Sequence, residues 1–513
     1  MINLELAKLW INDQEVQAEA RFETFNPATG EPIAEVCAAG PDEVRAAVEA
    51  ERAAFPAWSA LSVKERCRYL LAARKVLIAG IDDVVALITR EQGKPNVEAL
   101  TSEVSSVIDM LAYYAEHTPQ FLAPEEVTFH QPHLMGRRGQ VLREPLGVVG
   151  IISPWNMPFL LPMISVITAL AAGNTVVLKP SEFTPLIGLK IAELFHKVGL
   201  PSGVLNVIPG DGRAGAALVS APDVARIAFT GSVATGKRVA AACAELLRSS
   251  TLELGGIGPL IVLDDVDPEV AAAGAVWTRF TNCGQVCLSA ERVYVLEAIA
   301  ELFMAKVTEI VQSLQVGPGT DPNVDVGPLI NENQLSVAEQ HVADAIAKGA
   351  QVLAGGKRLS DKGPLFYAPT VLADVDHSMA VMNEESFGPV MAIMVAKDEA
   401  EALRYANRLR VGLSATIWTG DRERGEALAR KLEMGMVWVN DSIVYVGAPQ
   451  MPYGGVKESG WGRNLSHHGL HEMTNVKTIV STDSQEQMWW YPYNEQKLMI
   501  TKMYVEMNLE AFQ

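Results

Sequence analysis

The chain has 513 residues, of which 49% are hydrophobic and 20% charged, as is ordinary for a globular enzyme. This length exceeds what one hydrophobic core usually serves, so two or three domains are expected. The formal net charge of −19 argues against nucleic acid and anionic membrane surfaces as partners. Five cysteines make no disulfide framework, and the N-terminus shows no signal-peptide pattern, so we expect a cytoplasmic protein.

The first predicted elements are helical and cover Pro41–Ala79, with Pro41 and Asp42 opening one helix. Residues 145–178 then contain no charged residue, a length that could cross a bilayer. Several prolines and glycines interrupt this stretch, so a membrane span is not expected. We predict instead a strand, a buried helix and a second strand, at Val148–Ile152, Pro158–Ala172 and Thr175–Leu178.

Short apolar strands alternate with helical patterns from about residue 140 to 440, a rhythm typical of parallel sheets with crossover helices. The series restarts near residue 254, which indicates a second α/β domain. The first series continues with Leu186–Val198, Val204–Val207, Ala214–Val219 and Ile227–Phe229. The second comprises Leu260–Leu263, Pro268–Phe280, Arg292–Leu296 and Ala300–Leu314. A strand at Val476–Ser481 precedes an aromatic tail, which we expect to pack on a neighbouring subunit or on its own domain.

Three segments are candidates for a nucleotide site. Residues 210–215 match G-x-G-x-x-G between a strand and a helix, but no Asp or Glu follows between 224 and 244, so a structural turn is equally compatible. A second glycine-bearing turn contains Ser232, which could cap a helix or meet a phosphate. Lys179 and Glu182 follow a strand and could straddle a ribose.

The catalytic candidates are Cys287, Asn156 and Glu253. A thiol attacks a carbonyl when it is an accessible thiolate, and Gly284 would let the backbone approach the group that Cys287 attacks. Asn156 offers an amide donor in an apolar segment, which suits an oxyanion. Glu253 lies in an apolar strand, where a carboxylate is either paired or has a raised pKa suited to proton transfer.

Together these motifs closely resemble the NAD(P)-dependent aldehyde dehydrogenase superfamily, from Phe25–Gly30 to the neighbourhood of Lys477. The most specific matches are Leu252–Gly256 and Gly284–Cys287. The resemblance implies an α/β fold with a Rossmann-type cofactor domain, a second α/β catalytic domain and a small bridging β-sheet, in a homodimer or homotetramer. The implied divisions are residues 1–122 with 143–253 for NAD binding, 254–452 for catalysis, and 123–142 with 470–513 for bridging.

The resemblance also implies the chemistry. Cys287 would attack the aldehyde to give a thiohemiacetal, whose oxyanion Asn156 and the Cys287 backbone N–H would hold. Hydride transfer to the nicotinamide would leave a thioester, and Glu253 would activate the water that releases the acid. Glu182 favours NAD over NADP, because its carboxylate would repel a 2′-phosphate. The implied cofactor residues are Ile152, Ser153, Pro154, Trp155, Lys179, Ser181, Glu182, Gly212, Gly231, Ser232, Gly236, Leu254, Gly255, Glu385 and Phe387.

The substrate-lining residues implied by the resemblance are apolar, aromatic or neutral, and no arginine stands at Ile164 to hold a second carboxylate. We therefore expect an uncharged aliphatic or aromatic aldehyde. The implied lining residues are Met157, Leu161, Ile164, Thr281, Val286, Tyr445 and Tyr453, with Trp438 from the same loop region.

Several alternatives remain open. A CoA-acylating relative would pass the acyl group to a thiol, against which Glu253 argues, and a non-catalytic relative should have lost some of the three catalytic candidates. Cys283 could pair with Cys287, although a small lining residue is the simpler interpretation. His467, His468 and His471 have helical metal-ligand spacing, but nearby ligands are few, and we predict no metal.

Overall fold

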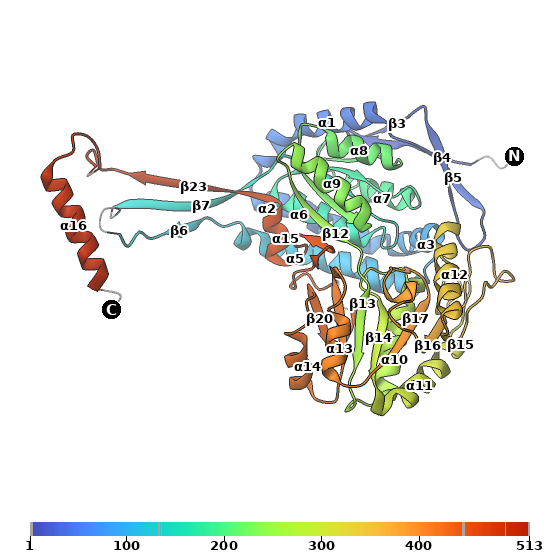
Figure 1. Cartoon of the computed structure of the whole chain (residues 1–513). Helices are drawn as coiled ribbons and strands as arrows, with labels where there is room; N and C mark the ends of the chain where they lie inside the picture. Colours follow the sequence, from blue (N-terminus) through green and yellow to red (C-terminus); the bar gives the residue numbers. More distant parts are fainter. Residues whose placement is uncertain (1–3, 132–133, 135, 444–446, 488, 511–513) are drawn as a thin grey trace.

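The structure is a computed structural model that describes residues 4–131, 134, 136–443, 447–487 and 489–510 (Figure 1). Within these ranges, eight strands form one sheet in the order β22–β12–β11–β8–β9–β10–β2–β3. Its central strands are parallel, and the antiparallel β2, β3 and β22 lie at the edges. The strands are β2 (Leu9–Ile11), β3 (Gln14–Val16), β8 (Val148–Ile152), β9 (Thr175–Lys179), β10 (Leu205–Val207), β11 (Val224–Gly231), β12 (Ser249–Leu254) and β22 (Gly460–Trp461).

Helices cover both faces of this first sheet, as in doubly wound α/β folds. One layer packs α1 against α8 and α8 against α9, and the other packs α2, α3, α5, α6 and α7 together. The first layer is α1 (Pro41–Ser59), α8 (Gly212–Ser220) and α9 (Val233–Glu245). The second is α2 (Val63–Ala79), α3 (Ile81–Gln92), α5 (Ser105–Phe121), α6 (Leu160–Ala172) and α7 (Pro185–His196).

A second sheet joins seven strands of the described chain in the order β15–β16–β17–β14–β13–β19–β20, parallel except at β15. The strands are β13 (Gly258–Val262), β14 (Ala290–Leu296), β15 (Gln351–Ala354), β16 (Thr370–Ala373), β17 (Val390–Ala396), β19 (Ser414–Trp418) and β20 (Met436–Val439). Its helices are α10 (Pro268–Phe280), α11 (Ala300–Ser313), α12 (Glu332–Ala347), α13 (Glu399–Ala406) and α14 (Arg422–Ala429).

A third sheet projects from the body as an arm (Figure 1). In the described residues it is antiparallel and contains β23 (Thr474–Thr482), β7 (Arg137–Pro145) and β6 (Glu125–Val127). Helix α16 (Glu495–Glu510) lies at its far end, and α15 (Ser466–Glu472) leads into β23 at its base. The α/β class with a small bridging sheet was therefore predicted correctly.

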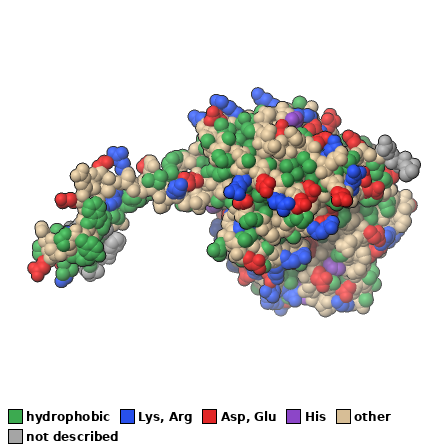
Figure 2. Space-filling model, turned by 90° about the horizontal axis from the view of Figure 1, so that it is seen from above, with side chains coloured by type: hydrophobic (Ala, Val, Ile, Leu, Met, Phe, Trp, Pro, Cys, Tyr) green, Lys and Arg blue, Asp and Glu red, His purple; other side chains and the backbone are tan. Residues whose placement is uncertain are grey.

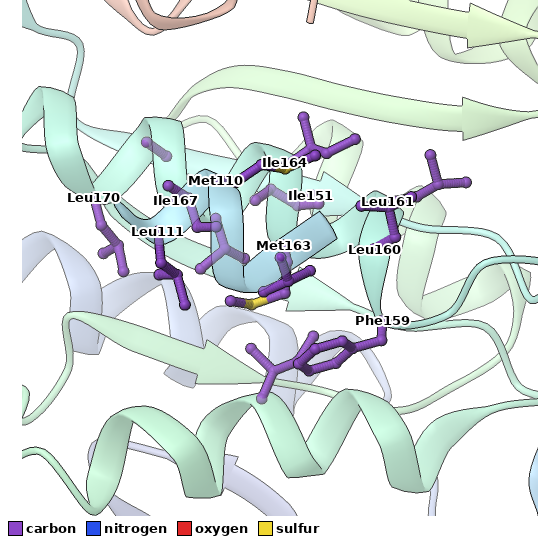
Figure 3. Packing of buried hydrophobic residues seen from close by; sticks show 14 of the residues in the cluster. Met110, Leu111, Ile151, Phe159, Leu160, Leu161, Met163, Ile164, Ile167 and Leu170 are labelled. Atoms are coloured by element: carbon purple, nitrogen blue, oxygen red, sulfur yellow. The ribbon is translucent and has the colours of Figure 1, made fainter. Parts of the chain in front are cut away.

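Helix α6 accounts for the long uncharged stretch. All thirteen of its residues are buried, and Met163, Ile164 and Ile167 pack with Ile151 and Met110 in one core (Figure 3). Its location between β8 and β9 makes it the centre of a globular layer. No helix in the described part of the chain is long and apolar enough to span a membrane.

The helical prediction for Pro41–Ala79 is confirmed, whereas the bounds of several other predicted elements differ from the structure by a few residues. The helical segment Pro41–Ala79 is two helices, because Ser62 begins α2 with a capping box in which its hydroxyl accepts from the Glu65 N–H. The buried helix begins at Leu160 instead of Pro158. The residues before it form a turn. The Glu103 carboxylate accepts from the Phe159 and Leu160 N–H groups at the start of the helix.

Candidate active site

Cys287 follows α10 through a tight turn. Asn282 and Cys283 both adopt left-handed backbone conformations, with φ of 52° and 57°, which are uncommon for residues other than glycine. The buried Gln285 holds the turn, because its Nε2 donates to the Asn282 carbonyl at 2.9 Å and its Oε1 accepts from the Ile330 N–H at 2.9 Å. This turn fixes where the thiol points.

The role expected for Gly284 was wrong. Gly284 has φ of 74°, and a Cβ there would lie 2.3 Å from the carbonyl oxygen of Gly388. The glycine is therefore required for close packing of two backbone segments. The approach to the thiol depends instead on the cavities around it.

Two cavities meet at Cys287, one of about 270 Å³ and one of about 140 Å³. Both are lined by Asn156, Cys287 and Tyr453. Cys287 is partly exposed, whereas the other cysteines are buried. The thiol can therefore be reached from two sides, as a group between a substrate and a cofactor must be.

The larger cavity gathers residues from both main sheets. Trp155 and Phe387 meet edge to face across it, with ring centroids 5.4 Å apart. Glu385 accepts a hydrogen bond from the Gly256 N–H at 3.3 Å, and burial raises the pKa of this carboxyl to about 8. The predicted cofactor residues on its wall are Pro154, Trp155, Gly231, Ser232, Leu254, Gly255, Glu385 and Phe387; Thr230, Gln334 and Val337 were not predicted.

The other predicted cofactor residues lie outside this cavity. Ile152, Ser153, Lys179 and Ser181 are buried at the carboxyl ends of β8 and β9, the edge where open parallel sheets bind ligands. The Lys179 Nζ lies 3.4 Å from Oε2 of the more exposed Glu182, and burial lowers the pKa of Lys179.

The remaining two predicted residues are glycines at helix starts. Gly212 is the first residue of α8 and has open space where a side chain would begin. Gly236 lies in the first turn of α9, and a Cβ there would come within 2.3 Å of Leu254 Cδ2. The second glycine thus allows α9 to pack closely on β12.

Asn156 is buried and fixed from several directions. Its side-chain Nδ2 donates to the Gln285 backbone carbonyl at 3.1 Å. Its backbone carbonyl accepts from Lys94 Nζ and Asn282 Nδ2, both at 2.9 Å. Lys94 is in turn paired with Glu103 at 2.6 Å, and neither side chain is exposed. An amide held this firmly is suited to bind a developing oxyanion without reorganisation.

Glu253 lies at the end of β12 and lines the larger cavity with Cys287. Neither carboxylate oxygen has a hydrogen-bond partner among the described residues. Burial raises the pKa of Glu253 well above its ordinary value, and Arg463 opposes this only in part. An unpaired carboxyl of raised pKa beside a thiol can accept a proton from a water molecule.

The electrostatic surroundings of Cys287 disfavour its anion. Burial raises the pKa of the thiol to about 12, and the charges of Glu385 and Glu253 act in the same direction, whereas a hydrogen bond with Tyr453 opposes them. The resting thiol is therefore protonated near neutral pH.

The smaller cavity is mainly apolar. Its predicted lining residues are Met157, Leu161, Thr281, Val286 and Tyr453, and the ones that were missed are Thr101, Ser102, Leu160, Trp277, Leu288, Ile443 and Gly447. Two predictions were wrong, because neither Ile164, buried on α6 (Figure 3), nor Trp438, buried on β20, is among the residues that line this cavity. Tyr445 lies outside the described residues.

The missed residues come from segments that carry no local motif. Thr101 and Ser102 belong to an irregular helical stretch at Ala99–Val104, and Trp277 is one of the exposed residues of α10. Lys94 and Glu103 were also missed, because residues 95–102 between them carry no local pattern that would reveal a buried ion pair.

The histidines at 467, 468 and 471 pack by their rings, with His467 and His468 centroids 4.1 Å apart. His471 Nε2 lies 2.9 Å from the Phe121 carbonyl. Among the described residues, no group of three or more His, Cys, Asp or Glu side chains could hold a metal ion.

Comparison with known proteins agrees with this architecture. The model of the aldehyde dehydrogenase family matches residues 10–479. The chain is 42% identical over 459 residues to the mitochondrial succinate-semialdehyde dehydrogenase of Arabidopsis thaliana, covering 89% of this chain and 85% of that one. It is 38% identical to the NADP+ succinate-semialdehyde dehydrogenase of Escherichia coli, over 89% and 93% of the two chains.

Among solved structures, the NAD+ complex of an aldehyde dehydrogenase from Bacillus cereus superimposes with a TM-score of 0.90 at 35% identity, covering 94% of this chain and 97% of that one. The chain belongs to the aldehyde dehydrogenase family, an NAD(P)-binding oxidoreductase family. Its reaction is thus the oxidation of an aldehyde.

Proposed function

We propose that this protein oxidises an uncharged aldehyde to the carboxylic acid with NAD+, with Cys287 as the nucleophile. The observation that carries the proposal is the position of the thiol between two cavities, with Asn156 on the wall of both and Glu253 on the wall of the larger one. The larger cavity would receive the nicotinamide end of the cofactor, which supplies the hydride acceptor.

The residues would act in sequence. The Cys287 thiolate attacks the carbonyl carbon, and the Asn156 amide with the Cys287 backbone N–H stabilises the oxygen anion. Loss of hydride leaves the acyl group on sulfur as a thioester. Glu253 then takes a proton from water, the hydroxide adds to the thioester, and the acid leaves as the thiol is restored.

The lining of the smaller cavity supports an uncharged substrate. None of its described lining residues is charged, and positions 444–446 are Val, Tyr and Val by sequence. Glu98 accepts from the Thr281 hydroxyl at 3.0 Å, and burial raises the pKa of this carboxyl to about 7, so the neighbouring acid provides no positive charge for a second carboxylate. Because an unpaired buried charge is costly, a semialdehyde acid would bind poorly. A cavity of about 140 Å³ suits a benzene-sized group.

This proposal departs from the two relatives named above, which are called succinate-semialdehyde dehydrogenases. Their names favour an acidic substrate for this chain, whereas the cavity lining favours a neutral one. A panel with benzaldehyde, hexanal and succinate semialdehyde, followed by NADH absorbance, separates the two.

We expect kcat/KM for the neutral aldehydes to exceed that for the semialdehyde by at least about tenfold, since desolvating one unpaired carboxylate costs more than ~1.4 kcal/mol. Cys287→Ala should abolish turnover with every substrate. Preference for the semialdehyde would overturn the substrate proposal and leave the reaction intact. Turnover that requires added CoA would instead support the acyl-transferring alternative.

NAD is proposed over NADP because the family resemblance assigns Glu182 to the adenosine ribose. Its carboxylate is 41% exposed and lies 3.4 Å from Lys179, so the pair can bind two ribose hydroxyls. A 2′-phosphate would meet the negative charge of Glu182 at close range.

The arm is proposed to join subunits in a homodimer or homotetramer. Its apolar side chains are exposed on β23 and α16, and Figure 2 shows hydrophobic side chains gathered on the arm. They are Val476, Ile479, Val480, Leu498, Met499, Ile500, Met503 and Val505. An apolar surface of this kind marks an interaction site.

A further inference from the structure

Tyr453 is held in place by its backbone. Its N–H donates to the Asn464 carbonyl and its carbonyl accepts from the Asn464 N–H, both at 2.8 Å. The neighbouring Gly454 approaches Glu253 so closely that a Cβ there would lie 3.0 Å from the Glu253 Oε1. The phenol ring is buried and lines both cavities. Its position is thus fixed by the same loop that borders the base.

The hydroxyl of Tyr453 points at the nucleophile. Its Oη lies 3.3 Å from the Cys287 Sγ, within hydrogen-bond distance for sulfur. In the neutral pair either group could donate. Once the thiol has lost its proton, only the phenol has a hydrogen to give, so the tyrosine must be the donor to the thiolate.

Among the described residues that line the two cavities, no cation stabilises the thiolate. Reactive thiols are commonly stabilised as anions by a nearby Lys, Arg or protonated His. None of the described residues that line either cavity is of these types, whereas Glu253 and Glu385 are acidic. Tyr453 is the side chain in contact with the sulfur that favours the charged form.

We propose that Tyr453 is a further catalytic residue, which donates its phenolic hydrogen to the Cys287 thiolate and so raises the fraction of enzyme ready to attack. The proposal rests on Cys287 as the nucleophile of the proposed function. Burial also raises the pKa of the Tyr453 hydroxyl well above its ordinary value, so the phenol stays protonated throughout the working pH range.

The hydrogen bond has two opposite consequences. It increases the amount of thiolate, but a stabilised thiolate is a weaker nucleophile, because reactivity falls with about half the change in basicity. Removing the hydroxyl should therefore slow the enzyme at neutral pH and leave it as fast or faster at high pH. A loss from disturbed packing would not depend on pH in this way.

The test is the alkylation of the free enzyme by iodoacetamide, in which the thiolate displaces iodide, measured from pH 6 to the highest pH at which the fold persists. Peptide mass mapping assigns the modified cysteine. We expect Tyr453→Phe to react about threefold more slowly at neutral pH, because a pKa about one unit higher leaves about tenfold less thiolate while each thiolate reacts about threefold faster. The two rates should converge as the pH approaches the pKa of the thiol, which burial raises to about 12.

Two comparisons keep the result interpretable. Tyr405→Phe removes a hydroxyl bonded to Glu401 at 2.9 Å, away from the cavities, and should leave the profile unchanged. A 3-fluorotyrosine at position 453 is a more acidic donor and should displace the profile downward. This second variant keeps the hydroxyl and so tests the idea even if Tyr453→Phe folds poorly.

An unchanged alkylation profile in Tyr453→Phe, or a displacement in the same direction for the fluorinated variant, would overturn the proposal. Because alkylation uses no aldehyde and no cofactor, it reads the thiol directly. Failure of the substrate panel would thus leave this result standing, and the reverse also holds.

Discussion

At the scale of single residues, the acidic side chains of the site disfavour the thiolate form of Cys287 in the free enzyme. Cys287 and Glu253 are both needed in their charged forms, yet Glu253 is buried, Cys287 is only partly exposed, and both lie near other acids. Each charge disfavours the other, so the enzyme gains one anion more easily than two. This arrangement suits a reaction in which the thiolate acts first and the carboxylate acts only after the sulfur has become neutral in the thioester.

The rate should therefore rise with pH. Burial raises the pKa of Cys287 to about 12, so the protonated thiol dominates at pH 6, and burial also raises the pKa of Glu253 well above its ordinary value. Since the nucleophile works as the thiolate, each increase in pH populates its working form further. Steady-state kcat measured between pH 6 and 9 should increase, and a flat profile would contradict this pairing.

Glu253→Gln should separate the two halves of the reaction. The amide has the shape of the carboxyl but cannot take a proton from water, so thioester hydrolysis should slow by about 10²–10⁴-fold. The first turnover should still release NADH, giving a burst equal to the enzyme concentration. Rapid mixing measures the burst, and its absence would place Glu253 in the first half of the reaction instead.

Glu182→Gln should widen cofactor use. Without the carboxylate, a 2′-phosphate near Lys179 no longer meets a negative charge, so kcat/KM with NADP should rise by about tenfold, while that with NAD falls. Glu193→Gln on α7 removes a surface acid paired with Lys190 and Lys197 and serves as the control. Parallel assays with both cofactors would show equal ratios in all three proteins if Glu182 does not select.

For single residues, the sequence predicts which side chains are reactive better than it predicts which side chains contact one another. Cys287, Asn156 and Glu253 do lie on one cavity wall, and each could be singled out in the sequence as a reactive or polar residue in an apolar segment. Ile164 was assigned to the cavity wrongly, since α6 is buried all round and its sequence has no polar face to show which side meets the cavity. The contact of Tyr453 with sulfur depends on a loop joined to Asn464, which no local pattern reveals.

Among the elements, the start of α6 controls the position of Asn156. Glu103 accepts from the Phe159 and Leu160 amides at 2.8 and 3.0 Å and binds Lys94, which donates to the Asn156 carbonyl. A carboxylate at a helix N-terminus is favoured by the exposed amides and the helix dipole. One buried ion pair thus links a helix end to the oxyanion site.

Glu103→Gln should destabilise the protein and impair catalysis together. Removing one partner leaves Lys94 buried without its counter-charge, at a cost of about 3–5 kcal/mol. Chemical denaturation measures this loss, and kcat should fall more than KM changes because the Asn156 loop loosens. The double variant Lys94→Met with Glu103→Gln should recover part of the stability and little of the activity. Equal stability of the single and double variants would show that the unpaired charge of Lys94 is not what destabilises Glu103→Gln.

Regular elements were predicted with small errors at their ends. Val148–Ile152 and Pro268–Phe280 have the predicted bounds, because apolar runs flanked by Gly, Pro or a capping Asp define both ends. The short β22 was not predicted, since two residues at Gly460–Trp461 carry no periodic signal and pair with β12 only through the tertiary fold. Assignment of a strand to a sheet edge needs contacts that are distant in sequence.

The whole molecule places its chemistry where the two large sheets meet. The larger cavity takes Gly231 and Glu253 from the first sheet and Cys287, Glu385 and Phe387 from segments of the second. Neither half alone holds both the base and the nucleophile. The division of the chain into domains proposed from the sequence remains a prediction, but the site requires both sheets to be in contact.

The arm provides the test of assembly. If β23 and α16 bury their exposed apolar side chains against another copy, truncation after Thr482 should reduce the number of subunits per particle. Light scattering during size-exclusion chromatography measures this number as the particle mass divided by the mass of one chain. Val480→Glu should do the same, because Val480 is exposed on β23 and a buried unpaired carboxylate opposes association. A stable interface of about 1,000 Å² or more would be lost.

Val352→Glu is the matched control, because Val352 is an exposed valine on β15 of the body and should leave the mass unchanged. Since the catalytic cavities lie in the body, a dissociated variant should retain thiol reactivity at Cys287 even if its thermal stability falls. An unchanged number of subunits in both arm variants would assign the apolar arm to a role other than self-association. Loss of thiol reactivity on dissociation would show instead that the assembled form maintains the site.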